Sequence, residues 1–184
     1  MTSAGATCWQ HLSGTVIPLP EPDVTLPPYH IAWCFGCGPE NAHGLGIKPR
    51  LNGDRVVAEL EFSPWFQGGP GVVHGGATAA FFDELMGFVM LAHLAPGVTA
   101  KLEINYTRPI PLGTTIRGEA WMSARDGRKM WAEAVGIDEA GHCFVEAKAL
   151  FIEIGVEHFA RIAEAMTPEQ REAMARYQEG GYYP

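Results

Sequence analysis

The chain has 184 residues, of which 47% are hydrophobic and 18% are charged, and its formal net charge is −8. This size and composition fit one globular domain with extensions at its ends, and they exclude a chain that is disordered throughout. The acidic balance argues against nucleic acid or an anionic membrane as the main partner, because phosphates require clustered Lys and Arg.

The compartment is predicted from the start of the chain and from its cysteines. Residues 1–10 lack the basic start and long apolar run of a secretory signal, so we expect a cytoplasmic location. The apolar stretch 77–92 contains Asp83 and Glu84, which would be costly in lipid, and it predicts a buried core helix rather than a membrane span. Four cysteines beside so many core residues do not suggest a disulfide scaffold.

The first half of the chain is irregular before it becomes periodic. Residues 1–30 mix Ser, Thr, Gly and Pro, which predicts an arm that wraps the domain or a partner subunit. Alternation from Arg55 then predicts a half-buried strand, followed by a Gly- and Pro-rich loop at 67–71. A helix is expected from about His74 to Leu94, since Pro96-Gly97 commonly stops one. One face of the strand carries Val56, Ala58, Leu60 and Phe62.

Four long alternating segments follow the helix. They cover residues 99–107, 114–124, 129–138 and 142–154, with hairpin-type turns before the third and the fourth. One long helix followed by such a meander predicts an α+β sandwich. Helical periodicity returns at 156–184, which we interpret as an appended helical extension to a single domain at 31–155.

The start of the predicted helix carries the chemistry. A helix start leaves backbone N–H groups unpaired, so the Gly75 N–H could hold a developing oxyanion, and Asp83 could supply a base. Eight residues of helix separate them by roughly 12 Å, so one carbonyl cannot touch both. If both serve one substrate, they come from different subunits, as at a two-fold interface of antiparallel helices. The spacing therefore predicts a dimer.

Simpler explanations exist for the same residues. Asp83 could face solvent or pair with a cation, and the pair Gly75-Gly76 could be only a tight entry to the helix. Glu84 lies about 100° further round the helix than Asp83, so we expect a structural or interfacial role for it. His74 suits capping or positioning of the Gly75 peptide better than direct proton transfer.

Ordered motifs lie at residues 34–41 with 44–46, at 66–76 and at 99–113. Together they resemble one family, the hot-dog-fold acyl-CoA thioesterases of the PaaI-like type, in which a curved antiparallel sheet wraps a long helix. The likeness covers roughly residues 34–154. A lone His-Gly-Gly would be weak evidence, whereas the ordered set, with an acid nine residues past His74, is specific. The motifs are Cys34-Phe35-Gly36-Cys37-Gly38-Pro39-Glu40-Asn41 with Gly44-Leu45-Gly46, then 66–76, and Thr99–Tyr106 leading to Arg108-Pro109-Ile110-Pro111-Leu112-Gly113.

The resemblance implies roles for individual residues. The Gly75 N–H would polarise a thioester carbonyl, Asp83 would act as general base or nucleophile, and Thr99 would orient the acid or its water. His74 completes the expected catalytic set, while Gly76, Gln67 and Arg108 are the expected substrate contacts. No cofactor is implied, and the family usually forms homodimers with composite sites, which two such dimers can extend to a tetramer.

Two groups of residues allow other interpretations. Cys34 and Cys37 have the spacing of zinc ligands, with Cys8, His11, His30 and His43 near in sequence. Because the same segment belongs to the resemblance without implying a metal, we expect a reduced, packed pair and no metal. Among the basic residues Lys101, Arg108 and Arg50, Arg108 is the best candidate for a coenzyme A phosphate, although scattered cations are more often solvated surface.

Two rival functions remain. A dehydratase or hydratase of the same fold would act on hydroxyacyl or enoyl thioesters, but its catalytic His usually precedes the glycine turn. A non-catalytic module would bind acyl-CoA with its helix acid kept for structure. The acyl group, the choice between coenzyme A and a carrier protein, and the number of subunits cannot be predicted from motifs.

Overall fold

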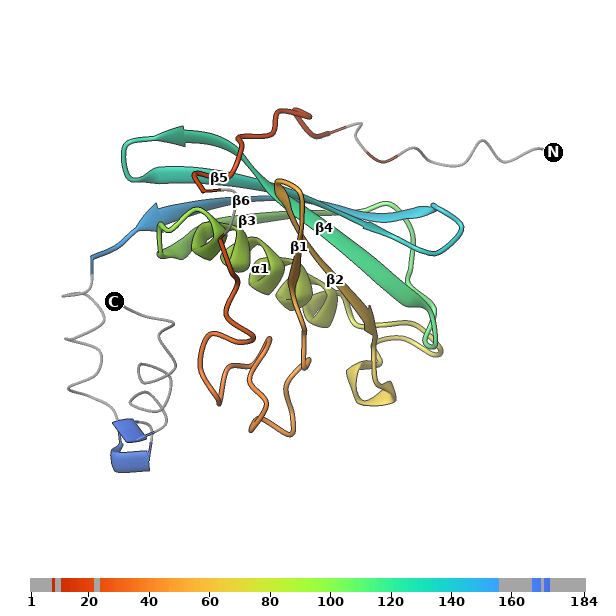
Figure 1. Ribbon diagram of the computed structural model, residues 1–184. Coiled ribbons are helices and arrows are strands. Elements are labelled where there is room, and N and C mark those ends of the chain that lie inside the picture. The colour runs from red at the N-terminus through yellow and green to blue at the C-terminus, as the bar shows by residue number, and fades with distance from the viewer. Residues whose placement is uncertain (1–7, 9–10, 22–23, 156–166, 170, 173–184) are drawn as a thin grey trace.

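A six-stranded antiparallel sheet wraps one long helix in the computed structural model, which describes residues 8, 11–21, 24–155, 167–169 and 171–172 (Figure 1). The strand order is β1-β2-β4-β5-β6-β3. Apart from five residues, the predicted extension at 156–184 lies outside the described residues. The elements are β1 (Arg50–Asn52), β2 (Arg55–Glu61), the short 3-10 helix η1 (Pro64–Phe66), α1 (Gly75–Ala92), β3 (Gly97–Tyr106), β4 (Thr115–Asp126), β5 (Lys129–Ile137) and β6 (Cys143–Glu153).

The predicted elements lie close to the observed ones. The helix expected at 74–94 is α1, and each of the four strands expected after it is present within two residues of its predicted bounds. Strand β1 was not predicted, because three residues are too few to establish an alternating pattern. It pairs with β2 through a tight turn in which Gly53 has φ +59°, a conformation that favours glycine.

Helix α1 forms the centre of the core. It contacts every strand from β2 to β6, and its aromatic residues Phe81, Phe82 and Phe88 are fully buried. The sheet approaches closely, since a Cβ at Gly118 of β4 would lie 2.7 Å from the Phe81 ring and one at Gly136 of β5 would lie 2.6 Å from the Phe82 ring. By length and composition alone α1 could span a membrane, but its packing is that of a core helix.

A β-bulge decides which way the first residues of β3 face. The register with β6 shifts between Thr99 and Lys101, so that Thr99 pairs with Phe151 while Tyr106 pairs with Val145. Both partners belong to the core on the helix side of the sheet. Residues seven apart on a regular strand would face opposite sides, and the extra residue restores a common side. Thr99 and Tyr106 therefore both face α1.

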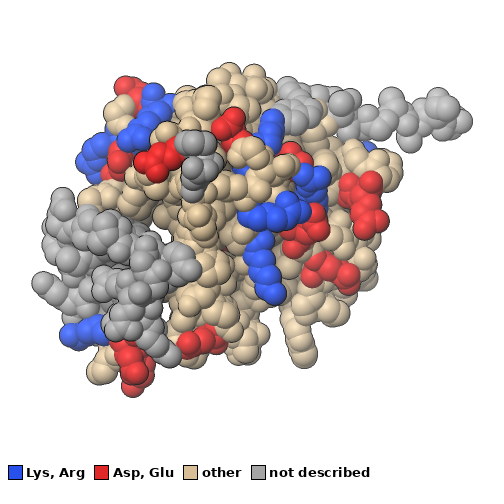
Figure 2. Space-filling model, in the orientation of Figure 1, with Lys and Arg blue, Asp and Glu red and all other residues tan. Residues whose placement is uncertain are grey.

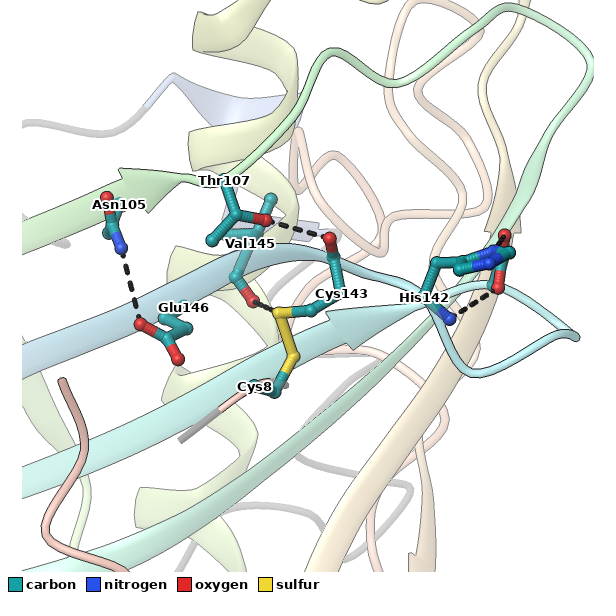
Figure 3. Close-up of a disulfide and its surroundings, with 8 residues drawn as sticks. Cys8, Asn105, Thr107, His142, Cys143, Val145 and Glu146 are labelled. Carbon is teal, nitrogen blue, oxygen red and sulfur yellow. Dashed lines mark hydrogen bonds and ion pairs between the residues drawn. A yellow bond between two sulfur atoms is a disulfide. The ribbon is translucent and has the colours of Figure 1, made fainter. Parts of the chain in front are cut away.

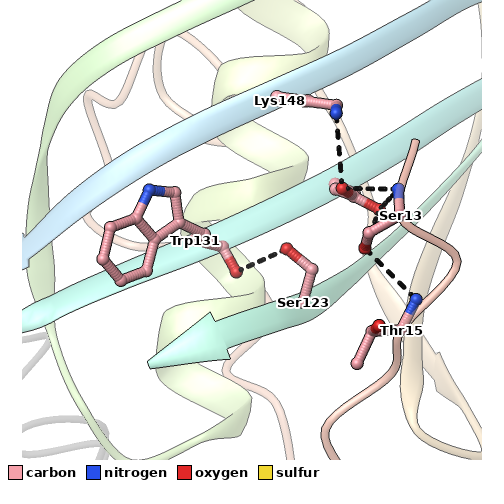
Figure 4. A network of polar contacts seen from close by, with 6 residues as sticks. Ser13, Thr15, Ser123, Trp131 and Lys148 are labelled. Carbon is pink, nitrogen blue, oxygen red and sulfur yellow. Dashed lines mark hydrogen bonds and ion pairs between the residues drawn. The ribbon is translucent and has the colours of Figure 1, made fainter. Parts of the chain in front are cut away.

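The N-terminal arm wraps the chain's own domain, one of the two predicted alternatives: its described residues up to Val16 lie on the outer face of the sheet, whereas Ile17, Leu19, Leu26 and Tyr29 pack against the core around α1 (Figure 1). The Ile17 N–H donates to the Met122 carbonyl at 2.8 Å, and the Ser13 N–H donates to the Glu133 carboxylate at 2.9 Å (Figure 4). Lys148 reaches the same carboxylate at 3.7 Å. A cavity of about 480 Å³ lies beside these contacts, lined among others by Ser13, Thr15, Ser123, Trp131, Glu133 and Lys148.

A disulfide fastens the start of the arm to β6. Cys8 and Cys143 are bonded, with Cα atoms 5.3 Å apart, and the Cys143 side of the bond is fully buried (Figure 3). A single disulfide is not the scaffold of several bridges that the sequence argued against, but this bond was not predicted from the sequence. The two cysteines are 135 residues apart, and no spacing pattern pairs residues at such a separation.

Candidate active site

Asp83 lies half-buried near the middle of α1 and faces the beginning of β3. The Thr99 hydroxyl donates a hydrogen bond to its carboxylate at 2.9 Å. Burial raises the pKa of Asp83 above the ordinary value for an aspartate, while the Thr99 hydrogen bond acts in the opposite direction. Asp83 is only partly exposed, and among the described residues it forms no ion pair with Lys or Arg. Asp83 is therefore a half-buried carboxylate whose orientation is fixed by Thr99.

The start of α1 leaves backbone donors without an acceptor among the described residues, and the Gly75 N–H is one of them. His74 is the N-cap, and its ring Nδ1 accepts the Gly76 N–H at 2.9 Å, which requires Nδ1 to be unprotonated. The His74 side chain thus caps the helix as expected, and the N–H that it binds belongs to the peptide unit between Gly75 and Gly76. Among the described residues no acceptor takes the Gly75 N–H, which leaves it for a ligand.

Tyr106 is a residue of this region to which sequence reasoning gave no role. Its hydroxyl donates to the Gly75 carbonyl at 2.7 Å, although the ring is about half exposed on β3. Burial raises the pKa of Tyr106, so the hydroxyl keeps its proton and stays a donor. Tyr106 belongs to the motif Thr99–Tyr106 that the sequence singled out. Its contact with Gly75 could not be predicted from local patterns, because the two residues are 31 positions apart.

The two halves of the predicted site do not meet within one chain. Gly75 is the first residue of α1 and Asp83 the ninth, which separates them by about 12 Å along the axis. Each half is tied to a different end of β3, Asp83 through Thr99 and Gly75 through Tyr106. β3 is an edge strand, and no described strand pairs with its outer edge.

The expected substrate contacts are spread along this side of the molecule. Gln67 is exposed and forms an isolated bridge with Val73, next to the helix start. The Gly76 N–H is occupied by His74, so any contact from Gly76 to a substrate would use its Cα or carbonyl. Arg108 is half-buried with its guanidinium 5.6 Å from the centre of the Phe144 ring.

The other candidate cations already have carboxylate partners. Lys101 pairs with Glu103, and Arg50 pairs with Glu59 at 3.0 Å. Figure 2 shows acidic and basic side chains next to one another on the face over β1 and β2. In the part of the chain that the structure describes, Arg108 has no such partner, which keeps it as the candidate for a phosphate.

Glu84 faces away from Asp83 into a second group of titratable side chains. His30, Cys34 and Cys37 surround it, whereas Cys8, His11 and His43 lie elsewhere. Burial acts against the charged forms of His30 and Glu84, but their mutual attraction and hydrogen bonds raise the pKa of His30 to about 9 and lower that of Glu84. The hydrogen bond with Cys37 lowers the pKa of Cys34 to about 5 and raises that of Cys37.

The fold and the matched residues define the class of this domain. Residues 70–145 match the family model of the thioesterase superfamily, and the helix wrapped by six antiparallel strands is the hot-dog fold. The fold is therefore the hot-dog fold that the resemblance predicted, and the part of the chain at 70–145 is similar to the thioesterase superfamily.

Particular relatives share this domain. The acyl-coenzyme A thioesterase THEM4 of Bos taurus is 32% identical over 120 residues, which is 62% of this chain and 49% of the relative. A solved thioesterase superfamily protein is 27% identical with a TM-score of 0.62, covering 72% of each chain. A hypothetical thioesterase protein from Streptococcus pneumoniae TIGR4, solved with coenzyme A, has a TM-score of 0.56 at 18% identity, covering 59% of this chain and 86% of that one.

Proposed function

We propose that the chain hydrolyses acyl thioesters, with acyl-CoA as the substrate class. The contact that carries the proposal is the 2.9 Å hydrogen bond that holds the half-buried Asp83 carboxylate against Thr99. The chain spans about half the length of the THEM4 relative, which is why its own activity is a proposal. A thioester carbonyl is a good electrophile, so one oxyanion donor and one base suffice.

The reaction follows from the two halves of the site. Asp83 accepts a proton from water as the oxygen of that water bonds to the thioester carbon, and the Gly75 N–H stabilises the resulting oxyanion. The carbon–sulfur bond then breaks, and the proton on Asp83 passes to the leaving thiolate. A single turnover in heavy-oxygen water tests this role. If Asp83 is instead the nucleophile, it forms a mixed anhydride as the thiolate leaves; when water opens that anhydride at the Asp83 carbonyl, the first acid released contains no heavy oxygen and the label is found in Asp83.

The same proposal includes a homodimer that completes each site. Antiparallel pairing of two β3 edges, with the two-fold axis at Glu103 and the bulge between Thr99 and Lys101 adding one residue, would set Thr99 of one protomer opposite the partner's Tyr106. Because Thr99 holds Asp83 and Tyr106 holds Gly75, this pairing brings the acid of one protomer to the glycine of the other. An unpaired edge strand is also a ready template for such pairing.

A second observation supports the choice of Asp83 and Thr99. The Streptococcus pneumoniae thioesterase protein has also been solved as two single variants, one with an aspartate and one with a threonine replaced by alanine. Those two positions are 16 residues apart, and Asp83 and Thr99 have the same separation. The likeness to that protein establishes only the fold, so the test must use this chain.

The test removes one backbone N–H without removing the helix. Gly75→Pro deletes the donor at the first helical position, where proline is well tolerated, and His74 before it already has the extended backbone that a following proline requires. Gly75→Ala keeps the N–H and is the matched control, since its Cβ would meet Tyr106 at an ordinary 3.4 Å. We expect thiol release from a panel of acyl-CoAs to fall by about 100-fold or more for the proline variant and far less for the alanine variant.

Mixing variants tests the composite site separately. Gly75→Pro and Asp83→Asn chains, unfolded and refolded together, would form heterodimers with one intact site, and activity should return to about a quarter of the wild-type value. If the mixture regains no activity while wild-type chains are active after the same treatment, each site lies within one chain. If the wild-type chain releases no thiol but binds acyl-CoA, the protein is a binding module. If it instead adds water to an enoyl thioester, it is a hydratase. Either result would contradict the hydrolytic function.

The tetramer and the cytoplasmic location stay predictions. The Cys8–Cys143 bond makes the location worth testing, because structural disulfides are rare in a reducing cytoplasm. Size measurement in solution and fractionation of the source cells would address the two points.

A further inference from the structure

Four side chains converge on the side of α1 that Asp83 does not use. They are Glu84 of the helix and His30, Cys34 and Cys37 of the segment that crosses it. One potential ligand atom from each lies within 4.8 Å of all the others. His30 Nδ1 is 2.8 Å from a Glu84 oxygen, and the Cys34 thiol is 3.3 Å from the same oxygen.

The surroundings hold these atoms in place. The His30 ring stacks on Phe88 with centroids 4.2 Å apart, which turns its Nδ1 toward Glu84. The His30 backbone N–H donates to the Cys37 sulfur at 3.0 Å. A backbone N–H pointing at a cysteine sulfur stabilises a thiolate and orients it, as outer contacts do around metal ligands.

Two glycines allow the loop to close over the carboxylate. A Cβ at Gly36 would lie 2.4 Å from the Glu84 side chain, and one at Gly38 would lie 2.4 Å from the Cys34 backbone nitrogen. The turn between them is tied by the Gly38 N–H, which donates to the Cys34 carbonyl at 2.9 Å. The loop therefore brings both sulfurs to one point above the helix.

The donor set decides which ion would fit. Two thiolates, one imidazole and one carboxylate are ligands of Zn²⁺, and four protein ligands without an open position are typical of a structural site. Tetrahedral zinc places its ligand atoms roughly 3.3 to 3.8 Å apart. Two of the contacts here are 2.8 and 3.3 Å, so small side-chain shifts would admit the ion.

We propose that His30, Cys34, Cys37 and Glu84 bind one structural Zn²⁺, which joins the segment before β1 to α1. The inference goes beyond the hydrolytic function and does not depend on it. The ion would replace contacts among four titratable groups that are largely shielded from water, and it would hold the helix face that carries Glu84, about 100° round the helix from Asp83. A reduced, packed pair without metal, the expectation from the sequence, is the competing state.

The experiment measures metal and thiols on the same folded protein. The protein is produced with zinc in the medium, and gel filtration then removes loosely bound ions. Elemental mass spectrometry should find about one zinc per chain. Cobalt(II) bound in place of zinc should give the thiolate charge-transfer and strong visible bands of a tetrahedral site. Cys8 and Cys143 are bonded, so Cys34 and Cys37 are the free thiols to be titrated. They should resist alkylation until a chelator removes the ion.

Neighbouring residues give matched variants. Glu84→Gln and Cys37→Ser should lower the zinc content and the affinity for cobalt by about tenfold or more. Asp83→Asn removes the adjacent charge and His43→Ala removes an exposed His from the same segment, and both should keep the metal. Where Cys37→Ser fails to fold, removal and return of zinc on the wild-type chain supplies the same readout.

Three results would overturn the proposal. In the first, the wild-type chain contains no zinc although the ion was supplied. In the second, Cys34 and Cys37 are alkylated equally fast with and without zinc. In the third, the His43→Ala control loses as much metal as the Glu84→Gln and Cys37→Ser variants. A Cys34–Cys37 disulfide in the isolated protein, with no bound metal, would likewise assign the pair to redox chemistry instead.

Discussion

Asp83 and Glu84 are consecutive acids on one helix, yet they lie in different chemical environments. About 100° of rotation turns Asp83 toward the edge strand β3, where one hydroxyl contacts it, and Glu84 toward a loop that supplies a histidine and two thiols. Burial raises the pKa of the first, while the partners of the second lower its pKa despite burial. The comparison teaches that surroundings rather than residue type decide in which direction the pKa of each acid moves.

The largest expected effect separates the two acids directly. Asp83→Asn should lower kcat by about 100-fold to 10,000-fold, because the amide cannot accept the proton, while the thermal midpoint stays close to that of the wild type. Glu84→Gln should instead cost about 1–3 kcal/mol of stability, with a much smaller loss of turnover per folded molecule. Paired thiol-release assays and melting curves measure both. Similar losses of turnover in the two variants would remove the distinction.

The contact between Thr99 and Asp83 sharpens the Asp83 side. Thr99→Val removes a hydrogen bond to a carboxylate and should lower kcat by about 10-fold to 100-fold. Because this bond lowers the pKa of Asp83, its loss raises that pKa, and the acid limb of kcat/KM should move to higher pH. Thr99→Ser restores a hydroxyl and is the control. An unshifted pH profile in the valine variant would deny the positioning role.

Glycine substitutions sharpen the Glu84 side. Gly36→Ala places a methyl group 2.4 Å from the Glu84 side chain and should cost about 1–3 kcal/mol of stability. Gly75→Ala, at the other site, meets only an ordinary contact with Tyr106 and should melt like the wild type. Denaturant unfolding compares them, and equal stability of the two variants would show that the loop is not tightly packed.

The smallest expected effect concerns Tyr106. Tyr106→Phe removes the hydroxyl that donates to the Gly75 carbonyl and should lower kcat by about threefold to tenfold. KM should change little, since Tyr106 would act on the proposed oxyanion donor only by holding the Gly75 backbone through its carbonyl. A change in KM alone would mean that Tyr106 contacts the substrate instead.

Local patterns predicted the elements, and non-local contacts decided the details of both sites. Alternation and helix signals placed α1 and four strands, since each depends on residues a few positions apart. The side that Thr99 faces depends on a bulge that no pattern reveals. Cys34 and Cys37 were singled out by spacing, but Glu84 reaches them from 50 positions away. The Asp83–Thr99 contact was expected only through the family resemblance.

The bond between Cys8 and Cys143 makes most of the domain one covalent ring. A protease that cuts once at any exposed loop between these residues would leave two pieces that migrate together until a reductant is added. A nicked molecule could then keep α1, the sheet and both groups of side chains assembled. Gels run with and without reductant after limited digestion would therefore report the state of this bond in its natural compartment.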